Sequence, residues 1–514
     1  MINNLIENNF GLIKPFTFIR DLSPSAEGFE MTENKMDTTK LKKIYMIGIK
    51  GVGMTMLAQF FADNGIEVIG SDTKEIFMTD EVLKKAGIKV IEEFDENNIP
   101  KDADLIVYSS SYNSKTNPEV AKAVTGKIRA IPYAIALGEV FNQKYGIAVI
   151  GSHGKTTTTA WLGFVLEQAG KKPNVMVGSV VPQFNGSSLV NTSHYLIVEA
   201  DEYQNKLQYF NPKGVLLNNI EYDHPDYFPT VEDYQNVFID FIKKIPSKGF
   251  LVANFDDETI NKVAKVNCRG HVISYAINNT ADFMAYDISQ QDGQQFFKVR
   301  MAVDADAADF SDEKAKEDFN KSQSELGSFS IKLSGIHNIY NALAVIAASI
   351  ELEVDLVDIR KNLAEFTGTA RRMQKMGEYK GAIIIDDYAH HPTEIKATLN
   401  GVRQLYPKNN LKVVFHPHTF TRTLALLDDF ASSFALADEV IVLDIYGSAR
   451  EQQGGVHAKD LLEKIKINYP TKKIMHIPTL KEVETYLRDD LKKNEVVVLM
   501  GAGDVFRVGE NLIS

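Results

Sequence analysis

The sequence predicts an α/β protein of three domains, and three observations support this prediction. The 514 residues exceed what one compact core holds and suggest two to four domains. Short β-branched runs alternate with helix-like segments, which is typical of a parallel sheet covered by helices. This alternation restarts at two further points of the chain, and the loops differ each time. We therefore expect domains at residues 43–143, 144–366 and 367–514, after a poorly ordered tail at residues 1–42.

The predicted strands are short runs rich in apolar and β-branched residues. In the first domain they lie at residues 43–49, 66–72, 88–92 and 103–111, with helical segments at 54–65 and 79–87. In the second they lie at residues 145–155, 195–201, 214–224 and 249–257. In the third they lie at residues 382–388, 411–418, 438–446 and 495–504. An acidic stretch with few aromatic residues, at about 301–327, predicts a mobile surface insertion in the second domain.

Composition narrows the classes of function. Hydrophobic residues make up 44% of the chain and charged residues 24%, as in ordinary globular proteins. The net charge of -12 argues against a general nucleic-acid or membrane-surface partner. Cys268 is the single cysteine, so an intrachain disulfide and a cysteine metal cluster are excluded. No export signal or membrane-spanning run is evident, and we expect a cytoplasmic protein.

A glycine-rich loop follows the first strand of the second domain. In the string GSHGKTTTT, Gly151 and Gly154 are followed by Lys155 and Thr156. Backbone N–H groups of such a loop bind phosphate at the start of a helix, while the Lys supplies positive charge and the Thr hydroxyl reaches Mg²⁺. Val149 stands where the standard pattern has an earlier glycine, so the loop is a shortened G-x-x-G-K-T. The alternative is a structural turn capped by threonines.

Polar side chains follow the next two strands of this domain. Glu199 and Asp201 follow one strand, and Asp223 and His224 follow the other. Open parallel sheets bind ligands beyond the carboxyl ends of their strands, so these side chains should converge on the glycine-rich loop. A carboxylate and an imidazole beside a bound triphosphate are candidate Mg²⁺ ligands. This convergence favours a nucleotide site over a turn.

A second glycine-rich loop lies in the first domain. Gly48, Gly51 and Gly53 stand between a strand and a helix, and Asp72 ends the next strand. Such glycines let the backbone approach a pyrophosphate, and the acidic residue takes a ribose hydroxyl. The spacing is G-x-x-G-x-G rather than G-x-G-x-x-G. We therefore favour another diphosphate ligand over NAD.

The string DDYAHHP, residues 386–392, opens the third domain. It places two carboxylates, a phenol and two imidazoles in one loop. Strand-end capping explains a pair of aspartates, but packing does not explain this density of reactive groups. The loop is a candidate part of an active site.

Four motif groups together resemble the Mur ligase family, the ATP-dependent amide ligases of peptidoglycan precursor synthesis. The groups are GIKGVGM, GSHGKTTTT, EADE with NNIEYDH, and SGIHNIYNALA with ARRM. The resemblance runs in order over residues 43–510 or so. It implies a Rossmann-like N-terminal domain for the UDP-sugar and a central P-loop ATPase domain. It also implies a Rossmann-like C-terminal domain that completes the ATP site and receives the amino acid.

Within the family, this sequence is most similar to the alanine-adding branch. Four strings carry that similarity: IDDYAHHPTEIKATL, FHPHTFTRT, LDIYGSAREQ and MGAGD. The implied substrates are UDP-N-acetylmuramate, ATP and L-alanine, with two Mg²⁺ ions and an acyl-phosphate intermediate. The expected assembly is a monomer or homodimer with no nucleic-acid or membrane partner. Two alternatives stay open: the branch that reattaches a recycled tripeptide to UDP-N-acetylmuramate, and a non-catalytic protein that binds ligands under nucleotide control.

The family's motifs imply roles for residues of this sequence. ATP binding is implied for Gly151, Ser152, His153, Gly154, Lys155, Thr156, Thr157, His337, Asn338, Asn341, Arg372 and Asp386. Metal binding is implied for Thr156, Glu199 and His224, and catalysis for Lys155, Glu199, His224 and His390. UDP-sugar binding is implied for Gly48, Gly51, Val52, Gly53, Met54, Asp72 and Ser109. Amino-acid binding is implied for Tyr388, His390, His391 and Arg422. The carbamylated lysine of some family members is not expected here.

Two departures bear on the choice of amino acid. The alanine-adding branch usually reads PHRYxR, and here Thr419 replaces the first arginine of that string while Arg422 is kept. An arginine can clasp a carboxylate with two parallel hydrogen bonds, so its loss changes how the substrate is held. The string EADEYQNK, which contains Tyr203, resembles the corresponding string of the tripeptide-recycling branch. Alanine remains the first expectation.

Overall fold

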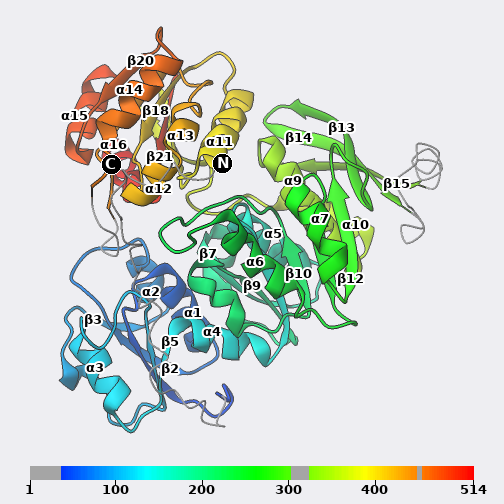
Figure 1. The fold of residues 1–514 in the computed structure, drawn as a ribbon, viewed down its shortest axis with the longest axis vertical. Coiled ribbons are helices and arrows are strands. Elements are labelled where there is room, and N and C mark those ends of the chain that lie inside the picture. The colour runs from blue at the N-terminus through cyan, green and yellow to red at the C-terminus, as the bar shows by residue number, and fades with distance from the viewer. Residues whose placement is uncertain (1–35, 303–322, 448–453) are drawn as a thin grey trace, which may run out of the picture. The chain divides into compact units, whose positions relative to one another are not determined.

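The computed structural model describes residues 36–302, 323–447 and 454–514 (Figure 1). These residues form three sheets, each covered by helices, and the predicted α/β fold of three domains is confirmed. Within the described parts of the chain, none of the helices is long and apolar enough to cross a membrane.

Two predicted segments lie mostly outside the described residues, and their described ends differ from prediction. The tail was expected to reach residue 42, yet Met36 is buried and its N–H donates to Glu139 Oε2 at 3.0 Å. The insertion was expected at about 301–327, yet residues 323–327 form part of a strand that pairs with its neighbour. Contacts with residues that are distant in the sequence hold Met36 and residues 323–327 in place.

The N-terminal sheet is parallel, with the order β3-β2-β1-β4-β5. Its strands are β1 (Lys43–Ile47), β2 (Glu67–Ser71), β3 (Lys89–Ile91), β4 (Leu105–Tyr108) and β5 (Ala130–Pro132). Its helices are α1 (Val52–Asp63), α2 (Asp80–Lys85), the 3₁₀ turn η1 (Glu96–Asn98), α3 (Pro118–Thr125) and α4 (Tyr133–Asn142). The strand order reverses between β1 and β4, so the loops after these strands border the crevice where such sheets bind ligands.

The middle domain has a ten-stranded sheet with the order β15-β14-β13-β12-β11-β10-β6-β9-β7-β8. Its strands are β6 (Tyr145–Ile150), β7 (Asn174–Val181), β8 (Gly186–Leu189), β9 (Tyr195–Glu199), β10 (Gly214–Leu217), β11 (Phe250–Asn254), β12 (His271–Ala276), β13 (Phe283–Gln291), β14 (Gln294–Ala302) and β15 (Gln323–Ile331). Its helices are α5 (Lys155–Gln168), η2 (Pro182–Phe184), η3 (Tyr203–Tyr209), α6 (Val231–Ile242), α7 (Glu258–Asn267), α9 (Ile336–Glu351) and α10 (Leu356–Glu365). The antiparallel extension β13–β15, visible in Figure 1, was not predicted.

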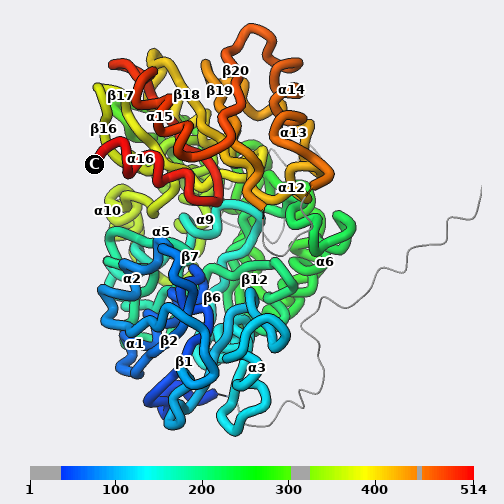
Figure 2. Tube along the Cα trace, turned by 90° about the vertical axis from the view of Figure 1, so that its left-hand side faces the viewer, coloured from blue at the N-terminus to red at the C-terminus, as the bar shows by residue number. Residues whose placement is uncertain are grey.

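The C-terminal sheet has the order β16-β17-β21-β18-β19-β20, with β16 antiparallel to β17. Its strands are β16 (Gln374–Tyr379), β17 (Ala382–Asp387), β18 (Asn410–Phe415), β19 (Glu439–Val442), β20 (Lys473–His476) and β21 (Glu495–Met500). Its helices are α11 (Pro392–Leu405), α12 (Phe420–Ala425), α13 (Leu427–Ala431), α14 (Ala458–Asn468), α15 (Leu480–Asp490) and α16 (Phe506–Ile513). Separate apolar clusters cover the two faces, one with α11, α13 and α14 and one with α15 and α16 (Figure 2).

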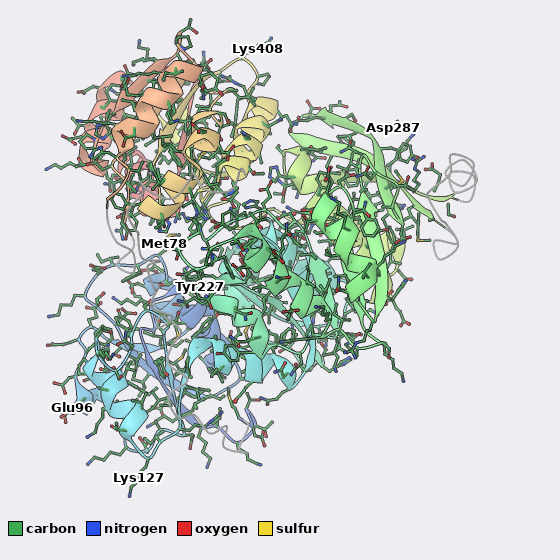
Figure 3. The ribbon with its side chains drawn as sticks, viewed as in Figure 1. Met78, Glu96, Lys127, Tyr227, Asp287 and Lys408 are labelled. Carbon is green, nitrogen blue, oxygen red and sulfur yellow. The ribbon has the colours of Figure 1, made fainter. Side chains whose placement is uncertain are left out.

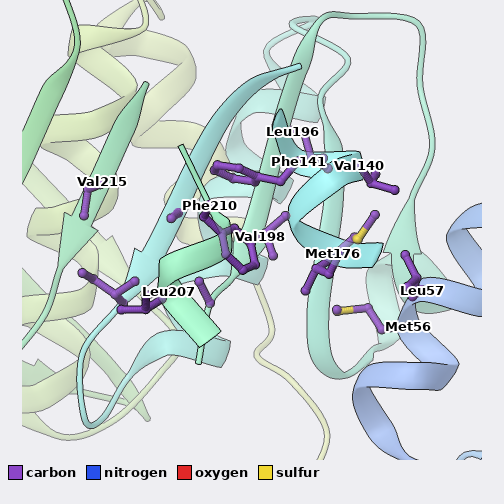
Figure 4. Packing of buried hydrophobic residues seen from close by; sticks show 14 of the residues in the cluster. Met56, Leu57, Val140, Phe141, Met176, Leu196, Val198, Leu207, Phe210 and Val215 are labelled. Atoms are coloured by element: carbon purple, nitrogen blue, oxygen red, sulfur yellow. The ribbon is translucent and has the colours of Figure 1, made fainter. Parts of the chain in front are cut away.

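The N-terminal and middle domains share one apolar core. Met56 and Leu57 of α1 lie close to Met176 of β7 (Figure 4). Phe141 of α4 packs edge-on against Phe210, with ring centroids 5.0 Å apart. Because this core is continuous, the loops of the N-terminal sheet are held against the middle domain.

A loop of the N-terminal domain also reaches the C-terminal domain. Met78, labelled in Figure 3, lies between β2 and α2, and its Sδ is 3.7 Å from Arg371 Nη1. The carbonyl of Ile76 accepts a hydrogen bond from Arg507 Nη2 at 2.5 Å. Contacts from this loop therefore join the two terminal domains.

Helix α5, which begins in the glycine-rich loop, is buried along most of its length. Trp161 lies at its centre, donates Nε1–H to the carbonyl of Leu363 and stacks on Phe366 with centroids 5.3 Å apart. Trp161 is the single tryptophan of the chain. Its fluorescence therefore reports on the packing of the middle domain.

Gly138→Ala tests the contact between α4 and the middle domain. A Cβ at Gly138 would lie 2.7 Å from the carbonyl oxygen of Tyr209, which is backbone and cannot swing away. We expect the substitution to lower the free energy of unfolding by roughly 1–3 kcal/mol, measured by urea titration of Trp161 fluorescence. Gly401→Ala is the matched control, because its Cβ meets the end of the flexible Met373 side chain. Its effect should be near zero or stabilising by up to about 1 kcal/mol. Equal effects of the two substitutions would contradict the packing described.

Candidate active site

The glycine-rich loop turns directly from β6 into α5. Gly151 and Gly154 have φ angles of +131° and +79°, which side chains rarely adopt. A Cβ on Gly154 would lie 2.7 Å from Asn341 Oδ1. Gly154 is the residue before the helix, so the first N–H groups of α5 have no partner within the helix and can bind an anion.

Lys155 lies inside this loop. Its Nζ donates to the carbonyls of Gly151 at 2.5 Å and Ser152 at 3.3 Å, and it pairs with Glu202 Oε2 at 3.0 Å. Burial opposes the charged form of Lys155, but Glu202 and Asp201 outweigh burial and raise its pKa. The lysine is therefore a partly buried cation at the start of α5.

Thr156 and Glu199 meet at the end of β9. Thr156 Oγ1 donates to Glu199 Oε1 at 2.8 Å, and the N–H of Gly178 donates to Glu199 Oε2 at 2.6 Å. A hydroxyl and a carboxylate at this separation are the oxygen donors that Mg²⁺ prefers. These residues fit the predicted metal position.

Glu202 is a site residue that the sequence reasoning missed. It is buried, and besides Lys155 it accepts a hydrogen bond from the Tyr234 hydroxyl at 3.1 Å and lies 3.9 Å from His224 Nε2. Ligand atoms of Asp201, Glu202 and His224 lie within 4.8 Å of one another, so the three could hold a cation. The signal was present, since Glu202 continues the same EADE string.

Asp201 is held as a carboxylate in this group. Its Oδ2 pairs with Lys206 Nζ at 2.5 Å. Burial works against ionisation, but Lys206, Lys155 and His224 outweigh it and lower the pKa of Asp201 to about 2. The Tyr203 ring packs against His224 at a tilt of 37°, with ring centroids 4.6 Å apart.

A cavity of about 940 Å³ opens beside the glycine-rich loop, with walls from the middle and C-terminal domains. Seven of the residues predicted to bind ATP line it, namely His153, Gly154, Thr157, His337, Asn338, Asn341 and Arg372. Asp386 was predicted to reach the nucleotide, but in this structure Asp387 lines the cavity and Asp386 does not. Successive strand residues face opposite sides of β17, and Asp386 pairs instead with Arg371 Nε at 3.1 Å.

The start of α9 supplies one wall of this cavity. Asn338 donates to the carbonyl of Ser334 at 2.7 Å and accepts from Asn341 at 3.1 Å, so each amide holds the other in place. Asn341 in turn accepts from Thr158 of α5 at 3.1 Å. Burial lowers the pKa of His337 to about 4, which keeps this imidazole neutral.

The DDYAHHP loop ends at α11. His390 Nδ1 lies 3.0 Å from the carbonyl oxygen of Tyr388 and 3.2 Å from Glu394 Oε2. Both partners are acceptors, so Nδ1 carries the proton and Nε2 is an acceptor. Burial lowers the pKa of His390 to about 3, and the ring is neutral. His391 precedes α11 and accepts the N–H of Thr393 at 3.4 Å.

Arg422 of α12 reaches the middle domain. Its Nε and Nη2 donate to the two carboxylate oxygens of Asp223 at 2.8 and 3.2 Å, and both residues are buried. The guanidinium was expected to clasp the carboxylate of an amino-acid substrate, but in this structure it clasps Asp223. Thr419, where the branch usually has arginine, is the N-cap residue before α12 and has a φ of +66°, a strained angle for a β-branched residue.

The loops after β1 and β4 meet in the N-terminal domain. Gly48 has a φ of +77°, and a Cβ there would lie 2.8 Å from Ser109 Cβ. The Asp72 prediction is not supported, because this buried carboxylate already accepts the N–H groups of Lys50 at 2.7 Å and Thr73 at 2.8 Å. The Met54 side chain packs in the core, which leaves only its backbone for a ligand.

The first turn of α1 supplies the remaining predicted contacts. Gly51 precedes the helix, Val52 is half exposed, and Gly53 would clash with the Tyr133 hydroxyl if it carried a Cβ, at 2.6 Å. The first N–H groups of α1 have no partner within the helix and can bind an anion, as those of α5 can. Burial raises the pKa of Tyr133, and the carboxylates of Asp201 and Glu199 add to the rise, so this tyrosine faces the middle-domain site.

Comparison with known proteins places the chain in a family. The model of the Mur ligase family catalytic domain matches residues 43–145, the Mur ligase middle domain matches 149–349, and the Mur ligase glutamate ligase domain matches 371–503. The UDP-N-acetylmuramate--L-alanine ligase of Desulfitobacterium hafniense (strain Y51) is 37% identical over 472 residues, which cover 91% of this chain and 99% of the relative.

Two solved structures share the fold. The UDP-N-acetylmuramate-alanine ligase of Thermotoga maritima has a TM-score of 0.73 at 24% identity, over 92% of this chain and 98% of that one. A murein peptide ligase of Psychrobacter arcticus has a TM-score of 0.67 at 24% identity, over 92% of this chain and 98% of that one. With three family models matched in order and a relative of such identity over its whole length, the chain belongs to the Mur ligase family.

Proposed function

We propose that this chain is an ATP-dependent ligase that joins L-alanine to the lactyl carboxylate of UDP-N-acetylmuramate in peptidoglycan precursor synthesis. One observation carries the proposal: a continuous network runs from Lys155 through Glu202 and His224 to the neighbouring Asp223, which holds Arg422 of the C-terminal domain. A phosphate-binding lysine and a second domain's arginine thus meet at one site. The name of the relative from D. hafniense supports these two substrates.

The three substrates have separate places in this proposal. The UDP-sugar lies at the loops that contain Gly48 and Ser109. These loops belong to the N-terminal domain, near residues 43–143. ATP lies in the cavity between the middle domain, 144–366, and the C-terminal domain, 367–514. L-alanine lies beside Tyr388, His390 and His391. A cytoplasmic location would supply all three substrates.

Two sets of side chains fit Mg²⁺. Thr156 and Glu199 offer oxygens 2.8 Å apart, and Asp201, Glu202 and His224 offer ligand atoms within 4.8 Å of one another. Bound Mg²⁺ would neutralise phosphate charge and hold two anionic substrates together. We propose one ion at each set.

In the first step, a lactyl carboxylate oxygen attacks the γ-phosphorus of ATP. The bond from this phosphorus to the β,γ-bridging oxygen breaks, which releases ADP and leaves an acyl phosphate. Catalysis of such transfers depends on positioning and on stabilising the charge that develops. The N–H groups after Gly154 would hold the phosphates, and the raised pKa of Lys155 keeps its ammonium charged beside them.

In the second step, the amine of L-alanine attacks the acyl carbon. A tetrahedral intermediate forms, and the carbon–oxygen bond to phosphate breaks to leave an amide. The attacking ammonium must first lose a proton, and the Nε2 acceptor of His390 would orient the amine while water removes that proton. Arg422 would act as a positioning residue, since Asp223 occupies its fork.

Experiments can distinguish two other functions from this one. A tripeptide-recycling ligase would use the same first step but accept a peptide amine, and Tyr203 beside His224 is the feature that favours it. A non-catalytic binding protein would need the cavity but not the Lys155–Glu202 pair. ADP formation separates the non-catalytic protein from a ligase, and ADP formation compared between L-alanine and the tripeptide separates the two ligases.

Lys155→Ala should abolish ligation. Removing the cation leaves the developing phosphate charge without its partner, and we expect kcat to fall by roughly 100-fold or more. The measurement is phosphate release that requires both UDP-N-acetylmuramate and L-alanine. Lys262→Ala is the control, since Lys262 pairs only with Glu258 on the surface of α7 and should keep full activity. Unchanged turnover of Lys155→Ala would refute the proposed site.

A panel of amines should identify the acceptor. We expect kcat/KM for L-alanine to exceed that for the recycled tripeptide by roughly 10-fold or more, because an enzyme discriminates between substrates by the contacts its site makes with the preferred one. Glycine and L-serine complete the panel, and ADP formation is the readout. A preference for the tripeptide would assign the chain to the recycling branch. Binding of UDP-sugar and ATP without ADP from any amine would favour the non-catalytic protein.

A further inference from the structure

A third group of candidate metal-ligating side chains lies between the glycine-rich loop and the C-terminal domain. His153 of the loop has Nε2 2.8 Å from Oε2 of Glu221, and His391 Nδ1 lies 3.8 Å from the same oxygen. The two imidazole rings are tilted, with centroids 4.6 Å apart. One ligand atom from each of the three residues lies within 4.8 Å of the others.

Their chemistry differs from that of the Mg²⁺ positions. Two imidazoles with one carboxylate are ligands for Zn²⁺ and related transition metals, whereas Mg²⁺ prefers oxygen. His391 is buried, and among the described residues its Nε2 has no hydrogen-bond partner. Because Nδ1 accepts the N–H of Thr393, Nε2 carries the proton, and Nδ1 holds the lone pair that a metal can bind.

A surrounding shell orients the ligands. Glu394 Oε1 lies 3.4 Å from His153 Nδ1, so a carboxylate backs this histidine as in many zinc sites. The hydrogen bond from the N–H of Thr393 to His391 Nδ1 is long, 3.4 Å, so a metal can take its place at the nitrogen nearest Glu221. Glu394 is itself held by Arg372 at 3.3 Å. Second-shell partners of this type fix the ring planes before a metal arrives.

We propose that His153, Glu221 and His391 form a Zn²⁺ site that joins the middle and C-terminal domains. His153 and Glu221 also line the cavity beside the glycine-rich loop. Zn²⁺ held there occupies the wall of this cavity, and it opposes entry of a nucleotide. The site is independent of the proposed ligation, because its ligands bind the metal whether or not the chain forms an amide.

Zinc binding to the full chain tests this site directly. The metal-free protein is titrated with Zn²⁺ by calorimetry without nucleotide, and Co²⁺ absorption provides a second readout of imidazole ligation. His391→Asn removes the imidazole but keeps a good N-cap for α11, and Glu221→Gln removes only the charge. We expect each to weaken Zn²⁺ binding by roughly 100-fold and to change the Co²⁺ spectrum.

Controls separate this site from other histidines. His271→Asn alters a surface histidine that pairs with Glu351 at 3.3 Å, and it should leave Zn²⁺ affinity unchanged. Trp161 fluorescence checks that each variant is folded. Equal Zn²⁺ affinity in wild type, His391→Asn and Glu221→Gln overturns the proposal. So does loss of binding in His224→Asn alone, since the metal then occupies the Asp201, Glu202 and His224 group.

Discussion

The buried ion pair between Arg422 and Asp223 is the interaction on which assembly of the site depends. It joins α12 to the loop after β10 by two parallel hydrogen bonds. Arg422 and the adjacent histidines hold the pKa of Asp223 well below its usual range, against the effect of burial. A buried pair that loses one partner leaves an uncompensated charge, which is strongly destabilising. Hence neither residue can be replaced alone without disturbing His224, which follows Asp223 in the chain.

The geometry of the phosphate loop depends on a second constraint, the parallel order of β9, β6 and β10. Because these strands run the same way, Glu199 and Asp223 follow them at the edge where Lys155 begins α5. The glycines allow the chain to turn there, and Lys155 pairs with Glu202 and offsets part of the negative charge gathered around it. Charge balance and strand direction therefore act together to hold the site.

Local sequence patterns predicted many of the strands and site residues. Where a prediction differs from the structure, the difference has a physical cause. The runs at 43–49, 145–155 and 382–388 became β1, β6 and β17, because burial on both faces leaves a strong apolar signal. The sequence alone does not reveal which of two adjacent aspartates faces the cavity. Asp386 was predicted to reach the nucleotide, whereas Asp387 lines the cavity. Residues 223 and 422 are 199 positions apart, and nothing local in the sequence indicates that they pair.

The most direct test of the account is a double-mutant cycle between Asp223 and Arg422, with ADP formation as the readout. Asp223→Asn, Arg422→Gln and the double variant are compared by kcat/KM with UDP-N-acetylmuramate and L-alanine. The account predicts strong coupling, about 2 kcal/mol or more, so that the double variant is little worse than either single one. Additive losses would show that the two residues act separately, and would contradict assembly of the site through this ion pair.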